Sequence, residues 1–222
     1  MRALVIQHGS DEPAGHVSGW LASRGAVQET CRIDCDDGER DARAYELIVS
    51  LGSEQSAYDD ELKWVARERR WLHDAVRVDV PVLGICFGSQ LLARAAGGQA
   101  MPAPYAEIGW VSVRPGQGSP IEAGPWLQWH FDTFTLPPGA ALLAESPAGP
   151  QAFTIGRSLG VQFHPEVTPE ILARWTGDGG DALEREGVDP GRLLAETQAH
   201  DGENRTRAWR LFDAFAERAG LS

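Results

Sequence analysis

The stretch Pro81–Gln90, with the sequence PVLGICFGSQ, decides the fold. Its first half, Pro81–Cys86, is apolar and predicts a β-strand that is buried on both faces. Cys86 ends this strand, with Gly84 two residues before it and Gly88 two residues after it. This Gly-x-Cys-x-Gly pattern is the cysteine form of a nucleophile elbow, a tight strand-to-helix turn that a side chain larger than hydrogen at either glycine would crowd.

The elbow predicts a reactive position for Cys86. It places the sulfur at the carboxyl end of the sheet, where the N-terminus of the following helix stabilises a thiolate. The amide of Phe87 comes next in the chain and can donate a hydrogen bond to an oxyanion. A structural cysteine between two turn glycines would have the same local pattern, so the interpretation depends on a second motif.

The second motif is Val161–Val167, with the sequence VQFHPEV, at the end of another apolar run. Residues two apart in an extended chain point the same way, so His164 and Glu166 can face one site, with Pro165 stiffening the link. A carboxylate beside an imidazole fixes its tautomer and stabilises the imidazolium, which a cysteine nucleophile needs from its base. An isolated His-x-Glu pair would be incidental, but its presence together with the elbow favours a Cys86, His164 and Glu166 triad.

Strand and helix patterns alternate through the first half of the chain. The expected strands are Ala3–Gln7, Ala26–Ile33, Leu47–Leu51 and Pro81–Cys86, and the expected helices are Gly15–Arg24, Asp59–Val76 and Ser89–Ala96. This alternation predicts an α/β fold with a mostly parallel sheet and helices on both faces. Short strands at Ile108–Arg114, Leu142–Ala144, Ala152–Ile155 and Gly160–Phe163 predict a small antiparallel extension. Helices are expected at Pro169–Trp175, Gly180–Glu186, Pro190–His200 and Arg205–Ala219.

The amino-acid composition limits the kinds of partner that we expect the protein to bind. The 222 residues carry a formal net charge of −12, which disfavours nucleic acid and anionic membrane surfaces. No apolar run is long enough to span a bilayer and the N-terminus does not resemble a signal peptide, so we expect a cytoplasmic protein. The sequence has no dinucleotide-binding or Walker-type loop and no metal-ligand spacing, so we expect neither a cofactor nor a metal.

The two motifs together, GICFGSQ at residues 84–90 and QFHPEV at residues 162–167, resemble the signature pair of class I (triad-type) glutamine amidotransferases. The resemblance covers nearly the whole chain. Glu107–Trp110 and Trp129–Phe134 are similar to segments of stand-alone members that resemble the glutaminase domain of GMP synthase. The resemblance implies a flavodoxin-like sheet and one amidotransferase domain over residues 1–222.

The resemblance also implies a chemistry and its residues. Cys86 would attack the glutamine side-chain carbonyl and form a glutamyl thioester, His164 would transfer protons and Glu166 would hold His164. The matching substrate-binding positions are Gln90 and the backbone of Trp129, His130 and Phe131. Gly52 would provide the second oxyanion donor, beside Phe87.

One departure from the family pattern concerns Leu51–Glu54, where many members have Gly-Gly-Pro. Some members keep this loop closed until a partner docks, so an inactive resting state is an alternative here. His130 and Asp132 could line the pocket, contact an acceptor, or form a hydrogen-bonded pair that supports the loop. For His8, at the end of the first strand, a structural role is the expectation.

Three functions fit the sequence. The first is a glutaminase that delivers ammonia to a separate synthetase or transferase subunit. The second is a γ-glutamyl peptidase that uses the same triad on another γ-glutamyl compound. The third is a catalytically silent regulatory or binding subunit.

Overall fold

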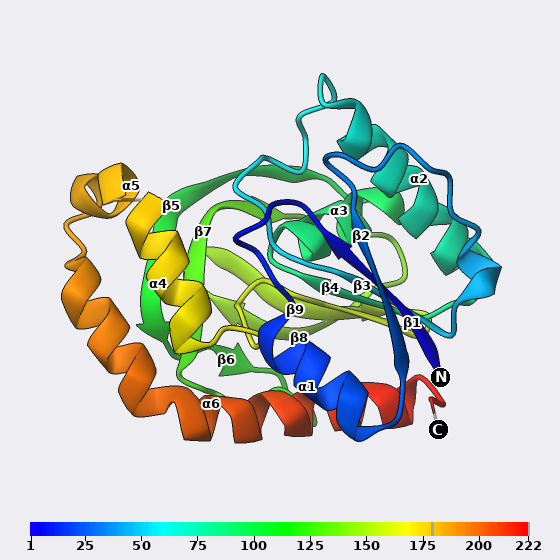
Figure 1. The fold of residues 1–222 in the computed structure, drawn as a ribbon. Helices are drawn as coiled ribbons and strands as arrows, with labels where there is room; N and C mark the ends of the chain where they lie inside the picture. Colours follow the sequence, from blue (N-terminus) through cyan, green and yellow to red (C-terminus); the bar gives the residue numbers. More distant parts are fainter. Residues whose placement is uncertain (179, 222) are drawn as a thin grey trace.

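The computed structural model describes residues 1–178 and 180–221, whose path is shown in Figure 1. Its central sheet has eight strands in the order β2-β1-β3-β4-β10-β9-β8-β6. In this order the strands are Val27–Arg32, Arg2–Gln7, Leu47–Ser50, Val82–Ile85, Ser158–Val161, Gly149–Ile155, Ala141–Ser146 and Arg114–Pro115. The first five are parallel and the last three extend the sheet in antiparallel fashion. This arrangement confirms the predicted fold.

A second, two-stranded antiparallel sheet pairs β5 (Ala100–Val111) with β7 (Trp126–Phe134). Helices α4 (Pro169–Asp178) and α5 (Gly180–Arg185) pack beside it, around Leu127, Ile171 and Leu183. This small sheet extends the molecule next to the carboxyl ends of the parallel strands (Figure 1).

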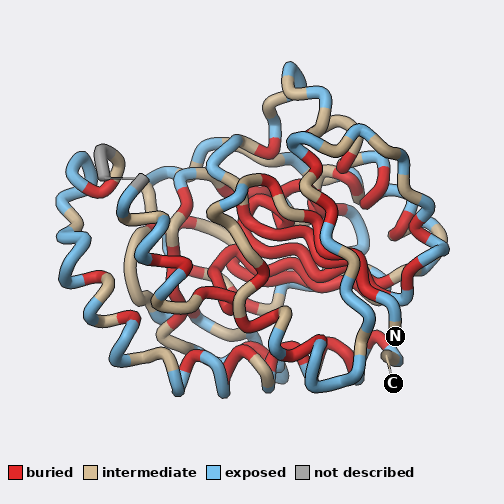
Figure 2. Tube along the Cα trace, viewed as in Figure 1, coloured by how far each residue is buried: buried red, intermediate tan, exposed pale blue. Residues whose placement is uncertain are grey.

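Helices cover both faces of the central sheet. Along β1, Ala3 and Val5 face α1 (Gly15–Ser23) and α6 (Pro190–Arg218), whereas Leu4 and Ile6 face α2 (Lys63–Arg77) and α3 (Phe87–Ala95). Alternate side chains of a strand point to opposite faces, so a continuous apolar run is what a strand between two helical layers requires. Figure 2 shows the buried positions concentrated along these central strands. Among the described residues, no helix combines the length and the apolarity needed to cross a bilayer.

Several of the expected helices and strands differ from those in the structure. The expected helix at Asp59 begins at Lys63, because residues 56–62 form turns in which Arg94 holds Asp60 at 3.1 Å. The expected strand Ile108–Arg114 is split between the longer β5 and the separate β6, and β7 was not among the expected strands.

The expected helices Pro190–His200 and Arg205–Ala219 form one helix, α6, which changes direction along its length in Figure 1. A glycine within a helix costs about 1 kcal/mol, a penalty that tertiary packing can offset. Here the helix continues through Gly202 because Asn204, which is buried, donates to the Val167 carbonyl at 3.2 Å and Ala208 packs into the core.

The first turn of α3 lies directly against the ends of two strands. The Gly88 amide donates to the Leu51 carbonyl at 3.0 Å. A Cβ added to Gly88 would lie 2.6 Å from the Ser50 carbonyl carbon, and one added to Gly84 would lie 2.6 Å from the Gly88 oxygen. The glycines on either side of Cys86 are therefore required by backbone-to-backbone contact.

The first prediction tests this contact with a matched pair of glycine substitutions. Gly88→Ala should lower the free energy of unfolding by about 3 kcal/mol or more, because the rigid backbone of β3 cannot move away. Gly202→Ala, where an added Cβ meets nothing within 4 Å, should instead stabilise the protein by about 1 kcal/mol. Urea unfolding of both variants measures the difference, and equal effects would contradict the proposed packing.

Candidate active site

Cys86 has the backbone conformation of an elbow. Its φ of 50° and ψ of −110° lie outside the regions that side chains usually adopt, and helix α3 begins at the next residue. Such a conformation costs about 1–3 kcal/mol and persists only where the surroundings impose it. Here the Cys86 amide is held by the Val161 carbonyl at 2.8 Å, at the end of β10. The sulfur therefore lies at the carboxyl ends of β4 and β10.

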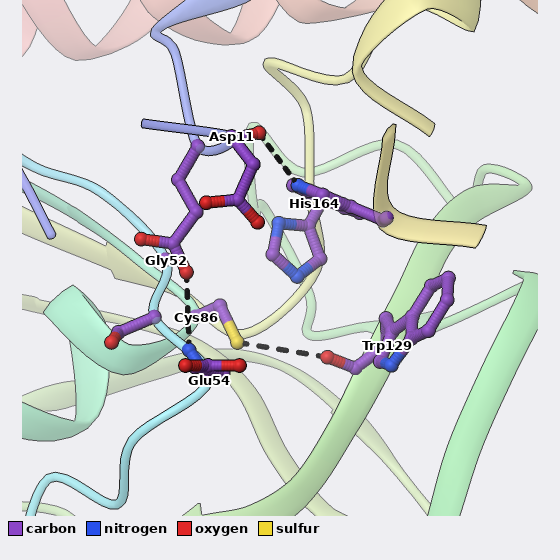
Figure 3. Close-up of a pocket in the computed structure, with 9 residues that line it drawn as sticks. Asp11, Gly52, Glu54, Cys86, Trp129 and His164 are labelled. Atoms are coloured by element: carbon purple, nitrogen blue, oxygen red, sulfur yellow. Dashed lines mark hydrogen bonds between the residues drawn. The ribbon is translucent and has the colours of Figure 1, made fainter. Parts of the chain in front are cut away.

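His164 and Glu166 form a buried pair beside this sulfur. His164 Nδ1 lies 2.7 Å from Glu166 Oε1, and the His164 amide donates to the Leu127 carbonyl at 2.8 Å. The other ring nitrogen, Nε2, is buried and has no hydrogen-bond partner in the described part of the chain. Figure 3 shows the imidazole facing the Cys86 sulfur. The ring edge of Trp175, whose centroid is 4.9 Å away, packs against the imidazole.

The electrostatics of the pair favour an imidazolium. Burial by itself lowers the pKa of His164, but the charges of Glu166 and Cys86 raise this pKa well above its usual value. A proton that leaves the sulfur is therefore stabilised on the histidine, which is the condition for a reactive thiolate.

A cavity of about 130 Å³ opens at this point. Cys86, His164 and Trp129 line it (Figure 3), and Trp175 adds a second aromatic side chain to the lining. The other lining residues are Gly52, Ser53 and the three carboxylate residues Asp11, Glu12 and Glu54. No lysine or arginine is among the described residues that line it. The pocket therefore combines a thiol, its basic partner and a ring of negative charge.

Gly52 lines the pocket, whereas Phe87 follows Cys86 as the first residue of α3 and is not among the described residues that line it. A Cβ added to Gly52 would lie 3.1 Å from His164 Cε1 and 3.8 Å from Cys86 Cβ, so this residue borders the reactive pair. Within residues 1–178 and 180–221, neither the Gly52 amide nor the Phe87 amide donates to a protein acceptor. Both amides remain available to a ligand.

Only some of the residues expected to bind substrate line the pocket. Trp129 lines the pocket, and its carbonyl lies 3.9 Å from the Cys86 sulfur. Gln90 is buried and reaches the sulfur only through Gln162: Gln90 Nε2 donates to Gln162 Oε1 at 3.1 Å, and Gln162 Nε2 lies 3.5 Å from the sulfur. Phe131 is exposed on β7 and is not a lining residue.

The His130 side chain points away from the pocket, into a buried polar network. Its Nδ1 lies 2.9 Å from the Asp132 carbonyl oxygen and its Nε2 lies 3.1 Å from Glu107 Oε2. The Asp132 carboxylate accepts hydrogen bonds from Ser56 at 2.7 Å and Tyr58 at 3.1 Å. This geometry corresponds to the loop-supporting interpretation of His130 and Asp132.

Glu12 is a pocket residue that sequence reasoning missed. Its Oε1 accepts a hydrogen bond from the Glu54 amide at 3.1 Å, while its Oε2 is buried and has no partner in the described part of the chain. Burial is the main cause that raises the pKa of Glu12 to about 7; His8 lowers it and Asp11 raises it further. Its place just after β1 was the available signal, because ligands bind at the carboxyl ends of parallel strands. Trp175, from α4, gave no such signal.

The similar proteins and the matching family model point to the same family. A model described as glutamine amidotransferase class-I matches residues 20–173. The chain is 30% identical over 203 residues to the glutamine-hydrolysing GMP synthase of Bordetella parapertussis, with 80% of this chain and 37% of the relative covered. It is 28% identical to a glutamine amidotransferase-like protein of Salmonella typhimurium, with 96% of each chain covered.

Solved structures agree with this result. A glutamine amidotransferase of Thermotoga maritima superimposes with a TM-score of 0.88 at 27% identity and 98% coverage of both chains. One from Methylobacillus flagellatus gives 0.88 at 26% identity, with coverage of 98% of this chain and 94% of that one. The chain spans about a third of the length of GMP synthases such as that of Bordetella avium, 35% of which is covered.

The second prediction concerns the charge of Glu166. In a Cys35→Ser background, which removes an exposed free thiol, Glu166→Gln should raise the pH of half-maximal Cys86 alkylation by iodoacetamide by at least about one unit. Without the carboxylate the imidazolium is less favoured, so the proton stays on the sulfur to higher pH. Glu170→Gln, an exposed carboxylate of α4, is the control. An unchanged profile for Glu166→Gln would show that the carboxylate does not tune the thiol.

Proposed function

Because the chain belongs to the class I glutamine amidotransferase family, we propose that it hydrolyses the side-chain amide of glutamine through a thioester on Cys86. The observation that carries this proposal is the convergence of Cys86 and the His164–Glu166 pair on one pocket. Two motifs that lie far apart in the sequence thus meet, as a nucleophile and its base require.

The geometry supports the following steps. The Cys86 thiolate attacks the amide carbonyl, and the resulting oxyanion accepts hydrogen bonds from the amides of Gly52 and Phe87. His164 Nε2 then gives its proton to the leaving ammonia, and the carbon–nitrogen bond breaks to leave a glutamyl thioester. Water, deprotonated by His164, attacks the thioester carbonyl, and the carbon–sulfur bond breaks to release glutamate and return the Cys86 thiolate beside protonated His164. Glu166 keeps the imidazole oriented throughout.

The walls of the pocket support recognition of the amino-acid end of glutamine. Of the expected substrate-binding residues, we retain Trp129 as a direct contact, since it lines the pocket. Gln90 acts indirectly, because it holds Gln162, which contacts the Cys86 sulfur. We add Glu12, whose unpartnered Oε2 is placed to accept a hydrogen bond from the α-ammonium group of the substrate.

For the ammonia, we propose an acceptor on a separate synthetase or transferase. The similar proteins include GMP synthases described as glutamine-hydrolysing, in which the matched region is a minor part of the whole. Family members of nearly this chain's length also occur, as the coverage of the Salmonella and Thermotoga proteins indicates. Delivery to a second protein is consistent with both sets of relatives.

The third prediction tests the reaction itself. The purified protein should release glutamate and ammonia from glutamine in equal amounts, and Cys86→Ala should abolish this release because no thioester can form. A coupled glutamate assay measures the rate. Cys35→Ser, which changes an exposed thiol outside the pocket, should retain wild-type turnover.

Other outcomes of this assay would identify a different function. Faster release of glutamate from γ-glutamyl dipeptides than from glutamine would favour a γ-glutamyl peptidase. Absence of turnover with both substrates, and with candidate acceptor proteins present, would contradict the proposal and favour a silent regulatory subunit.

The fourth prediction concerns Glu12. Glu12→Gln should lower kcat/KM for glutamine by roughly ten- to hundredfold, because a buried charged hydrogen bond is lost. Glutaramate, which is glutamine without its α-ammonium group, should be unaffected. With a pKa of about 7, Glu12 binds a cation only when deprotonated, so wild-type selectivity for glutamine over glutaramate should fall as the pH drops through 7. Glu61→Gln, an exposed carboxylate, is the control. Equal losses for the two substrates would exclude this role.

A further inference from the structure

A buried histidine–glutamate pair lies beside Gly52, which lines the pocket. His8 follows β1 and Glu68 belongs to α2; both side chains have 0% exposure, and His8 Nε2 lies 2.8 Å from Glu68 Oε2. Ser50 donates a hydrogen bond of 2.7 Å to the other carboxylate oxygen. Burying two charges carries a desolvation cost that their mutual attraction often fails to recover, so such a pair is weak evidence for a purely stabilising role.

The contacts of His8 define its charge. Its Nδ1 lies 2.8 Å from the Gly52 carbonyl oxygen, which can only accept, while its Nε2 faces a carboxylate. Both nitrogens carry a proton when both bonds are made, so the ring is an imidazolium. Burial lowers the pKa of His8, but Glu68 raises it above its usual value. The Gly52 carbonyl thus receives a charge-assisted hydrogen bond.

This bond completes a clamp on both sides of Gly52. The preceding peptide is held by its Leu51 carbonyl, which accepts from the Gly88 amide at 3.0 Å. The following peptide is held by His8, and the Glu54 amide is held by Glu12 at 3.1 Å. Because each trans peptide is planar, fixing its carbonyl also fixes the direction of its N–H. The Gly88 bond therefore fixes the direction of the Gly52 N–H, and the His8 bond fixes the next peptide, which carries the Ser53 N–H, so Gly52 is held from both sides.

The same side chain also contacts the other oxyanion donor residue. The His8 ring packs edge-on against the Phe87 ring, with centroids 4.7 Å apart, and against Trp64 at 5.3 Å. Phe87 is the first residue of α3 and follows the nucleophile. His8 thus bridges Gly52 and Phe87, the two residues whose free amides border the sulfur.

We propose that His8 and Glu68 are positioning residues that preset the oxyanion hole, so that the chain itself, and not a docked partner, orders the Gly52 loop. The inference rests on the proposed function in that it assigns the Gly52 amide to the oxyanion. Glu68 supplies the negative charge that keeps His8 protonated, and His8 transmits this constraint to Gly52. The isolated chain is then competent for turnover.

The fifth prediction uses two substitutions that each keep one half of the His8 contact. His8→Gln retains a donor near the Nε2 position, toward Glu68, and loses the Gly52 bond. His8→Asn retains a donor near the Nδ1 position, toward Gly52. Glu68→Gln, which is nearly isosteric, removes the charge without leaving a cavity. Each is made in the Cys35→Ser background and checked by thermal unfolding.

Losing an oxyanion donor costs about 10²–10³ in kcat, so His8→Gln and Glu68→Gln should lower kcat for glutamine at least roughly tenfold. His8→Asn should recover several-fold of this loss. Alkylation of Cys86 by iodoacetamide, which forms no oxyanion, should keep its wild-type rate in all three variants. An unchanged kcat, or an alkylation rate that falls in parallel with kcat, would overturn the proposal, since a general structural defect affects both reactions.

Hydrogen–deuterium exchange separates this inference from the proposed function. In His8→Gln and Glu68→Gln, the amides of residues 51–54 should exchange faster while those of residues 87–95 keep their protection. If the wild-type chain fails to hydrolyse glutamine even with candidate acceptor proteins present, the proposed function fails, and exchange alone decides the clamp. Unchanged exchange at residues 51–54 would then overturn the positioning role.

Discussion

The contact between the first turn of α3 and the ends of β3 and β4 is the constraint on which the rest of the structure depends. Gly84 and Gly88 let two backbone segments approach within hydrogen-bonding distance, and this approach forces Cys86 into a conformation that side chains rarely adopt. The sulfur is held at the sheet edge as a consequence. The same contact directs the Leu51 carbonyl toward Gly88 and so places Gly52 beside the sulfur. The positions of Cys86 and Gly52 thus depend on the same contact.

Much of this could be predicted from the sequence because local signals were strong. Apolar runs buried on both faces marked β1, β3 and β4, and the two glycines around Cys86 marked the elbow. The residues that were missed come from loops and from a later helix: Glu12 follows β1, and Trp175 belongs to α4. Their place in the pocket depends on tertiary packing, which no local periodicity encodes. The predicted break in α6 was wrong for the same reason, since Asn204 reaches Val167, a residue far away in sequence.

Three histidines of this chain show how surroundings assign roles to one residue type. His164 has one ring nitrogen bound to a carboxylate, the other has no partner among the described residues, and the ring faces a thiol. His8 and His130 each have both ring nitrogens occupied. A histidine whose nitrogens are both occupied cannot exchange protons with a ligand without breaking a buried bond, so its contribution is geometric. A sequence motif can indicate that a histidine lies near a site. Whether that histidine can exchange protons with a ligand depends on whether one of its ring nitrogens lacks a hydrogen-bond partner.

The edges of the central sheet have a consequence for the behaviour of the protein at high concentration. Exposed strand edges invite pairing with other chains, and β6 ends the sheet with only two residues, one of which is Pro115. Proline cannot donate a ladder hydrogen bond, so this edge offers little template for a further strand. At the other edge, β2 carries charged side chains such as Glu29, which pairs with Arg2 on the neighbouring strand. The sheet therefore ends in features that resist edge-to-edge aggregation.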